Sequence, residues 1–237
     1  MVFKKGGYYR MEAKEKLSVK EWFEHIWYYY KWLIILGGLV VIFLVIAFFQ
    51  LILKPDADVH IMYIGKGSIS VKGVNDLTKT VESLIDDYNN DGKKVCDYID
   101  LTALAEEESG EVFNADFNAA AIARFEVEIR SGDSVIFLMN EYYFKEAMEI
   151  GVLAKLSDVL DSTAMPEKTY NEYGVYLKDL DLYKAPGFNS LPANTILCIR
   201  RSPENDTIKY NRTMEVYTAN KLCFQKLITY KADSPSS

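Results

Sequence analysis

Histidine, the residue that enzymes use most often for acid–base catalysis, is scarce in this chain. Only His25 and His60 occur among 237 residues. A serine or cysteine nucleophile needs a general base, but His60 lies in a predicted strand and no Gly-x-Ser-x-Gly motif is present. Carboxylates at Glu106–Glu108, Glu126 and Glu128 offer an acid pair for glycoside chemistry, yet acidic runs usually mark solvated surface. We therefore expect a protein that is not an enzyme.

Cysteine is equally sparse. Cys96, Cys198 and Cys223 are an odd number and contain no Cys-x-x-Cys pair. This pattern indicates neither a disulfide framework nor a zinc site, and at most one pair of thiols can close. His25 adds no ligand set, because no Cys, Asp or His lies near it at metal-ligand spacing. The sequence predicts buried free thiols.

Loops that resemble cofactor or metal motifs are incomplete. Gly65-Lys-Gly-Ser68 follows a predicted strand and offers backbone N–H groups to an anion, but it lacks the third glycine of the dinucleotide fingerprint and the Gly-Lys-Ser/Thr ending. Asp87–Gly92 matches the opening of a calcium loop, but Lys94 and Tyr98 stand where an apolar residue and a bidentate glutamate are required. The sequence therefore predicts no cofactor and no metal site.

Positive charge is in deficit over most of the chain. The formal net charge is −7; residues 1–31 carry net +3, so residues 54–237 carry −10. An acidic domain argues against nucleic acid as a partner and against docking on anionic lipid.

One long apolar block stands out against this background. Residues 32–53 contain 22 consecutive residues without a formal charge. As a helix they extend roughly 33 Å, enough to cross a hydrocarbon core of about 30 Å. A cleaved secretory signal is the alternative, but the exit from Gln50 to Pro55 lacks the small residues of a cleavage site. We predict a transmembrane helix at 32–53 and contact with the lipid bilayer.

Aromatic residues crowd the segment just before this block. Trp and Tyr prefer the headgroup level of a membrane, where the ring leaves water and its polar tip stays hydrated. Ser18–Glu21 matches a capping box, so we expect a short amphipathic helix in the interface that turns into the span. The predicted membrane-interface residues are Trp22, Trp27, Tyr28, Tyr29, Tyr30, Lys31 and Trp32.

Lysine and arginine set the predicted orientation. Residues 1–31 hold seven of them, whereas the twenty residues after Leu53 hold three. Because segments rich in Lys and Arg stay on the cytoplasmic side, the N-terminus is predicted inside. We expect a single-pass cell-membrane protein with a cytoplasmic segment at 1–31, an extracytoplasmic domain at 54–231 and a disordered tail at 232–237.

The extracytoplasmic domain alternates strand-like and helix-like patterns. Short apolar runs predict strands, and apolar residues at helical spacing predict helices. This alternation predicts an α/β fold with a mainly parallel sheet and helices on both faces. The predicted strands lie at 59–64, 94–101, 134–139 and 195–200, the predicted helices at 76–88, 116–130, 142–150 and 214–230, and an irregular region at 164–192.

Two parts of the chain resemble known protein groups. The turn Arg130–Asp133, the apolar strand Val135–Leu138 and the segment Gly151–Leu160 resemble the first lobe of bacterial extracellular solute-binding proteins. The head of the chain, including Ile26–Trp32, is similar to the juxtamembrane segment of single-pass Gram-positive membrane proteins of unassigned function. The resemblance implies a single solute-binding-protein-like lobe, since about 180 residues are short for two lobes.

Ligands of open α/β sheets bind at the carboxyl ends of the strands, and tyrosines supply contact area with a polar tip. We therefore expect an aromatic-lined concavity that binds a small solute such as a sugar, peptide or amino acid. An interaction subunit of a cell-envelope or transporter complex is the alternative, and it predicts a flat apolar patch without a pocket. The candidate ligand-binding residues are Gly65, Lys66, Asn140, Tyr142, Tyr143 and Tyr173.

Overall fold

The computed structural model describes residues 19–52, 56–67, 69–103, 115–204 and 213–232. Several expectations fall wholly or partly outside these ranges, namely those on residues 1–18 with Ser18, the end of the span at Leu53, Ser68, the run Glu106–Glu108 and the tail after residue 232. The chain separates into two compact units, Met1–Lys54 and Pro55–Ser237. Each unit is described by itself.

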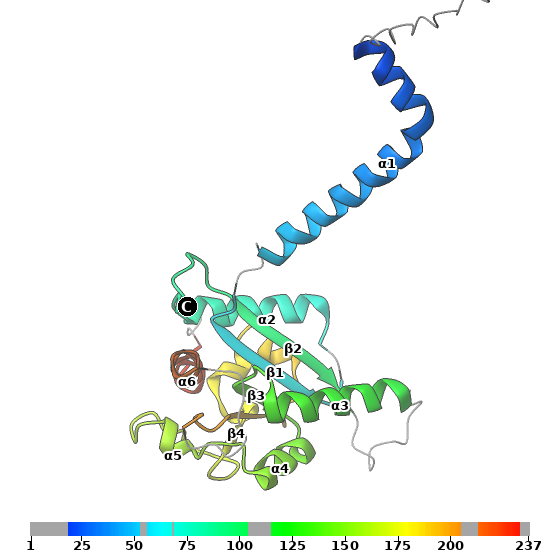
Figure 1. The fold of residues 1–237 in the computed structure, drawn as a ribbon. Helices are drawn as coiled ribbons and strands as arrows, with labels where there is room; N and C mark the ends of the chain where they lie inside the picture. The colour runs from blue at the N-terminus through cyan, green and yellow to red at the C-terminus, as the bar shows by residue number, and fades with distance from the viewer. Residues whose placement is uncertain (1–18, 53–55, 68, 104–114, 205–212, 233–237) are drawn as a thin grey trace, which may run out of the picture. The chain divides into compact units, whose positions relative to one another are not determined.

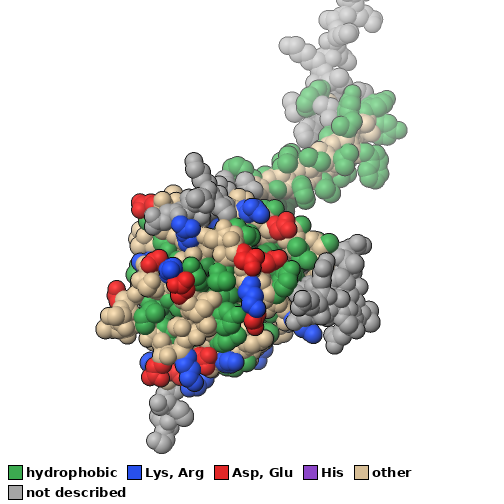
Figure 2. Space-filling view, turned by 90° about the horizontal axis from the view of Figure 1, so that it is seen from below, with side chains coloured by type: hydrophobic (Ala, Val, Ile, Leu, Met, Phe, Trp, Pro, Cys, Tyr) green, Lys and Arg blue, Asp and Glu red, His purple; other side chains and the backbone are tan. Residues whose placement is uncertain are grey.

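The first unit contains one long helix, α1 (Val19–Ile52), whose 34 residues extend roughly 51 Å (Figure 1). Within it, Trp27–Phe49 is a stretch of 23 residues long and apolar enough to cross a membrane. The side chains of this stretch are exposed, Trp32 to 76%, and Figure 2 shows them as a largely hydrophobic surface. The prediction of one N-terminal helix able to span a bilayer is confirmed.

The aromatic segment belongs to this same helix. The expected interfacial helix and the span form one helix, because α1 runs without interruption from Val19 to Ile52, and this helix bends along its length (Figure 1). No proline lies between these ends, and the pair Gly37-Gly38 disfavours a helix by only about 1 kcal/mol per residue. All seven predicted interface residues are exposed: Trp22, Trp27, Tyr28, Tyr29, Tyr30, Lys31 and Trp32.

The second unit is built on a five-stranded sheet. Its strands lie in the order β2-β1-β3-β5-β4. β1 pairs in parallel with β2 and β3, whereas β5 pairs antiparallel with β3 and with β4. The expectation of a mainly parallel sheet is therefore wrong, and the sheet is mixed. The bounds are β1 Val59–Gly65, β2 Cys96–Thr102, β3 Ile136–Met139, β4 Gly174–Tyr176 and β5 Ile196–Ile199.

The connection between β4 and β5 explains the antiparallel pairing. A parallel neighbour requires a crossover connection, usually a helix. Here the chain between the strands forms only short 3₁₀ turns, so β5 returns beside β4 in the opposite direction. These turns lie within the region predicted as irregular. Their bounds are η2 Leu177–Asp179, η3 Asp181–Lys184 and η4 Phe188–Ser190.

Helices cover both faces of the sheet, as predicted (Figure 1). Val59, Ile61 and Tyr63 of β1 share one core with residues of α2 (Val71–Leu84) and α6 (Met214–Ile228). The alternate residues Met62 and Ile64 share the other core with residues of α3 (Ala115–Ser131) and α4 (Glu141–Ile150). Every residue of β1 is buried. This agrees with its nearly continuous apolar sequence, which is typical of a strand covered on both faces.

Side-chain caps set where two helices begin. Ser70 accepts a hydrogen bond from Gly73 N–H at 3.1 Å, so α2 begins at Val71, five residues before the predicted start. Asn140 accepts one from Tyr143 N–H at 3.0 Å, and α4 ends before Gly151, whose φ is 81°. Apolar periodicity alone cannot locate such caps.

Gly187 allows the 3₁₀ region to pack closely against α2. Its φ is 85°, and a Cβ at this position would overlap the backbone nitrogen and Cα of Leu77. We expect Gly187→Ala to lower the free energy of unfolding by about 3 kcal/mol, from left-handed strain and overpacking together. Urea denaturation monitored by circular dichroism measures this loss.

Gly92 provides the matched control for this substitution. Its φ is 83°, but a Cβ there meets no atom within 4 Å. Gly92→Ala is expected to cost only the strain, about 1 to 2 kcal/mol. Equal losses for the two variants would show that the contact with Leu77 contributes nothing.

Candidate ligand-binding groove

The sequence-predicted site lies at the carboxyl ends of two adjacent parallel strands. Gly65 ends β1, and Asn140 follows β3. Asn140 donates its N–H to the Ile64 carbonyl at 3.0 Å, and a Cβ on Gly65 would lie 3.4 Å from that of Asn140. The strand order reverses between β1 and β3, so this is the switch point of the sheet. The structure thus brings together the predicted residues Gly65, Lys66, Asn140, Tyr142 and Tyr143.

The side chains at this edge also have structural contacts. The Asn140 side chain caps α4. Tyr143 is buried, and its ring centroid lies 5.0 Å from that of Phe125. Lys66 and Tyr142 are the exposed members of the set. The edge therefore presents one cation and one ring for contact with a ligand.

Tyr173 lies apart from the other predicted residues. It immediately precedes Gly174, which pairs with Cys198 of β5 on the far side of β3. Since β5 runs antiparallel to both neighbours, β4 runs in the direction of β3, and Tyr173 precedes its amino end. There the Lys155 ammonium lies 5.8 Å from the Tyr173 ring centroid.

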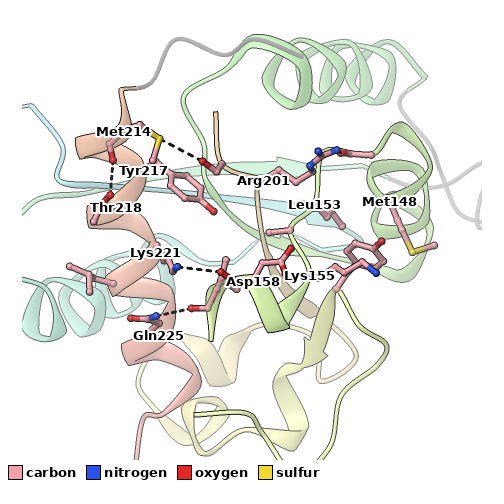
Figure 3. Close-up of a pocket in the computed structure, with 16 residues that line it drawn as sticks. Met148, Leu153, Lys155, Asp158, Arg201, Met214, Tyr217, Thr218, Lys221 and Gln225 are labelled. Atoms are coloured by element: carbon pink, nitrogen blue, oxygen red, sulfur yellow. Dashed lines mark hydrogen bonds between the residues drawn. The ribbon is translucent and has the colours of Figure 1, made fainter. Parts of the chain in front are cut away.

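Tyr173 instead lines a groove of about 900 Å³, which the sequence did not predict (Figure 3). One wall is α6, and the other is the segment from the end of α4 through the short helix α5 (Leu156–Val159). Arg201 and Ser202, just beyond β5, also contribute. The lining residues are Met148, Gly151, Leu153, Ala154, Lys155, Asp158, Val159, Tyr173, Arg201, Ser202, Met214, Tyr217, Thr218, Lys221, Leu222 and Gln225.

Helical spacing places the α6 residues on one face. Met214, Tyr217, Lys221 and Gln225 recur every three or four residues, so they project on the same side of the helix. Gln225 Nε2 donates to the Val159 carbonyl at 2.6 Å, and Lys221 Nζ donates to the Asp158 carbonyl at 3.3 Å. These two bonds join α6 to α5 across the groove (Figure 3).

Three cations and one carboxylate line the groove. Lys155 pairs with Glu172 at 2.8 Å, and this hydrogen bond raises the pKa of Lys155 and lowers that of Glu172. Arg201 Nη1 donates to the Gly151 carbonyl at 3.0 Å. Lys221 has no carboxylate within 4.0 Å among the residues that the structure describes. Lys221 therefore brings a charge that no neighbouring acid neutralises by direct contact.

Tyr217 is the most buried polar side chain of the groove. Only 5% of the residue is exposed, and its ring points from α6 toward the opposite wall (Figure 3). Burial, with a smaller contribution from the Asp158 charge, raises the pKa of Tyr217 to about 12. The hydroxyl therefore stays protonated at neutral pH and can donate a hydrogen bond. Within the described ranges it has no hydrogen-bond partner.

Helix periodicity is the signal that could have indicated this groove. Tyr217, Lys221 and Gln225 form a polar row at i, i+4 and i+8 on the closing helix. The sequence alone does not show which element faces that row. Arg201 gave no signal at all, because it simply follows a strand.

The loop that resembles a calcium site uses its oxygen atoms to hold its own backbone. Asp87 accepts hydrogen bonds from the N–H groups of Asp91 and Gly92, and Asp91 accepts one from Lys93. The buried carboxylate of Asp58 accepts three more from the same region, from residues 88, 89 and 95. These contacts give the Asp residues a structural role in this loop.

The three cysteines are buried free thiols, as predicted. Burial raises the pKa of all three, that of Cys223 to about 12. Since thiolates are the reactive form, these thiols are poor nucleophiles at neutral pH.

Comparison of the chain with protein-family models, with curated proteins and with solved structures finds no match.

Proposed function

We propose that this protein is a membrane-anchored, non-catalytic binding protein whose extracytoplasmic α/β domain holds a small solute in the groove beside α6. The groove itself carries this proposal. Ligand sites are typically concave, of about 300 to 1,000 Å³, with apolar walls and a few convergent polar groups. The groove has this size and this mixture of residues.

The lining residues support binding rather than chemistry. They include neither histidine nor cysteine, and their single carboxylate, Asp158, is exposed. A general base or nucleophile usually has a partner that activates it. Among the described residues, the Asp158 carboxylate receives only a 3.3 Å hydrogen bond, from the neighbouring Ser157 hydroxyl. Apolar and aromatic contacts with a few hydrogen-bond donors are typical of a binding site.

Helix α1 supports membrane anchorage. Its apolar side chains are exposed among the described residues of their own unit, and lipid is the environment that stabilises such a surface. The excess of Lys and Arg in residues 1–31 supports a cytoplasmic N-terminus. In this arrangement the aromatic residues Trp22–Trp32 contact the inner headgroup region.

The proposal keeps the resemblance to solute-binding proteins, but it places the ligand in the groove beside α6 instead of at the carboxyl ends of the strands. A single sheet provides one lobe, so no second lobe closes over the carboxyl ends of the strands. The groove uses α6 as its second wall instead. An interaction subunit of an envelope complex is the second candidate, and on the face that Figure 2 displays acidic and basic side chains are interspersed with the apolar ones.

Thermal unfolding of the full chain in detergent micelles tests the groove. Sugars, amino acids and short peptides are added separately, and one class is expected to stabilise the α/β domain. A ligand present at 100 times its dissociation constant adds about 2.7 kcal/mol to the free energy of unfolding.

A groove-filling variant makes the assignment specific. Leu222→Trp places a large ring in the groove and is expected to abolish the stabilisation by ligand. Val71→Trp adds the same ring at an exposed position outside the groove lining, and it should respond like the unmodified chain. If no ligand class stabilises the domain, or if Leu222→Trp still responds fully, the proposed function is wrong.

A further inference from the structure

The charge of the groove is opposite to that of the chain. Lys155, Arg201 and Lys221 outnumber Asp158 in the lining, although the whole chain has a formal net charge of −7. A concave site with local positive charge and low-dielectric walls attracts anions more strongly than an open surface does. The groove is therefore an electropositive site on an acidic protein.

Two donors converge at the α6 wall. Lys221 and Tyr217 are four residues apart, so their side chains project from the same face of the helix. Lys221 donates to the Asp158 carbonyl, a neutral acceptor. The Tyr217 hydroxyl is a donor with no acceptor among the described residues. The Tyr217 hydroxyl is open to solvent although its ring is buried, so it can donate a hydrogen bond to a ligand oxygen.

The charge balance favours a ligand with one negative charge. Lys155 is already paired with Glu172, and the Asp158 carboxylate lies on the same wall as the segment that Lys221 contacts. A dianion such as a phosphate monoester would approach Asp158 with two charges, and like charges repel. A carboxylate brings one charge and two acceptor oxygens, which suit one ammonium and one hydroxyl.

Apolar side chains surround these donors. Met148, Leu153, Met214 and Leu222 line the same groove. Methionine adapts its shape to different apolar groups. The groove thus pairs a charged end for an anion with adaptable walls for a hydrophobic body.

We infer, on the basis of the proposed function, that the groove selects amphipathic carboxylates. Lys221 and Tyr217 bind the single carboxylate of such a ligand. Met148, Met214 and Leu222 contact its apolar body. Short peptides with a free C-terminus and apolar side chains belong to this class. The inference specifies the ligand class, which the proposed function leaves open among sugars, amino acids and peptides.

A matched pair of probes tests the role of the charge. N-acetyl-leucyl-leucine carries the carboxylate, and N-acetyl-leucyl-leucinamide has the same apolar body without it. Isothermal titration calorimetry with the full chain in detergent micelles is expected to show at least tenfold tighter binding of the acid, since charge-assisted hydrogen bonds are stronger than neutral ones. Acetate, which lacks the apolar body, is expected to bind at least a hundredfold more weakly than the acid.

Variants assign the preference to named side chains. Lys221→Gln is expected to reduce the acid-to-amide ratio to below threefold, while Lys221→Arg retains most of it. Tyr217→Phe is expected to weaken the acid about threefold to tenfold, through loss of one hydrogen bond, and to weaken the amide less, because a neutral carbonyl is the weaker acceptor. Lys79→Gln removes an exposed lysine on α2 outside the groove lining and should change neither affinity.

The outcomes separate this inference from the proposed function. If both peptides bind equally and Leu222→Trp abolishes both, the groove binds ligands but the selection of carboxylates is wrong. An acid-to-amide ratio that Lys221→Gln leaves unchanged also overturns the assignment. If neither peptide binds and no other class stabilises the domain, both the inference and the proposed function fail.

Discussion

Arg200→Met is expected to lower the free energy of unfolding of the α/β domain by about 4 kcal/mol, because it leaves buried carbonyl groups without a donor. Arg200 is fully buried. Its Nε donates to the Ser134 carbonyl at 2.9 Å, and its two terminal nitrogens donate to the carbonyls of Ile129 and Glu128 at 2.7 Å each. Methionine fills a similar volume, so the lost hydrogen bonds dominate the effect.

The location of these carbonyls explains the size of the effect. Ile129 and Glu128 belong to the last turn of α3, where carbonyls tend to lack partners and cations are favourable. The Glu128 carbonyl also accepts from Gly132 N–H at 3.0 Å, so the carbonyls of Ile129 and Ser134 depend more on Arg200. Arg200 follows β5, and its N–H donates to the Val135 carbonyl just before β3. One side chain therefore joins the end of a helix to the start of the central strand.

Two variants frame the Arg200 prediction. Arg200→Lys keeps the charge but cannot reproduce the planar fork of donors, so we expect a loss of about 2 kcal/mol. Arg130→Met removes an exposed cation from the same helix end and should cost less than about 1 kcal/mol. Urea denaturation measures all three, and a shift in melting temperature of roughly 8 to 16 °C should accompany the Arg200→Met loss. A loss below that of Arg130→Met would contradict the proposed role of Arg200.

The turn that follows α3 shows that a sequence motif can have a local structural cause. Ser131-Gly-Asp133 contributed to the solute-binding resemblance. In the structure, Glu128 accepts hydrogen bonds from the N–H groups of Asp133 and Ser134 and from the Ser134 hydroxyl. A Cβ on Gly132 would overlap that carboxylate. The motif therefore has a local structural cause, whatever family the chain belongs to.

The strands that could be predicted from the sequence share one property: each is marked by a run of apolar residues that lies within the strand itself. Apolar runs located β1, β3 and β5 to within two residues at either end. The direction of β5 depends on the preceding connection, and β4 is only three residues long, too short for any periodicity. Burial of a polar side chain is equally non-local. Arg200 and Tyr217 are buried because α3 and α5 supply their surroundings, and no pattern around either residue reports this.

The groove was not predicted for a related reason. The prediction placed the ligand at the carboxyl ends of parallel strands, and the structure does bring Gly65 and Asn140 together there. It relied, however, on a mainly parallel sheet with the aromatic residues gathered at one edge. Because β5 is antiparallel, the chain reaches Arg201 at the opposite edge, where Tyr173 and α6 also lie.

Two arginines in the centre of α1 are expected to release the full chain from the membrane. Fourteen Leu, Ile, Val and Phe residues lie between Trp27 and Phe49, and each favours insertion by about 0.3 to 0.6 kcal/mol, or about 4 to 8 kcal/mol in all. Each arginine at the helix centre costs about 2.5 to 3.5 kcal/mol. Leu39→Arg with Phe43→Arg therefore nearly cancels the gain. Fractionation of cells with alkaline carbonate should find the unmodified chain in the membrane pellet and most of the double variant in the supernatant.

The matched control adds the same two charges to the other unit. Val71 and Val127 are exposed on α2 and α3, and their double arginine variant should remain in the pellet.

In intact cells, an added protease should remove the α/β domain of this control, because an N-terminus held inside by Lys and Arg leaves the domain outside. An unmodified chain that is soluble without detergent would refute the anchor. A membrane-bound chain whose domain resists the protease would refute only the orientation. The groove would then face the cytoplasm, and its ligands would be metabolites of the cell instead of external solutes.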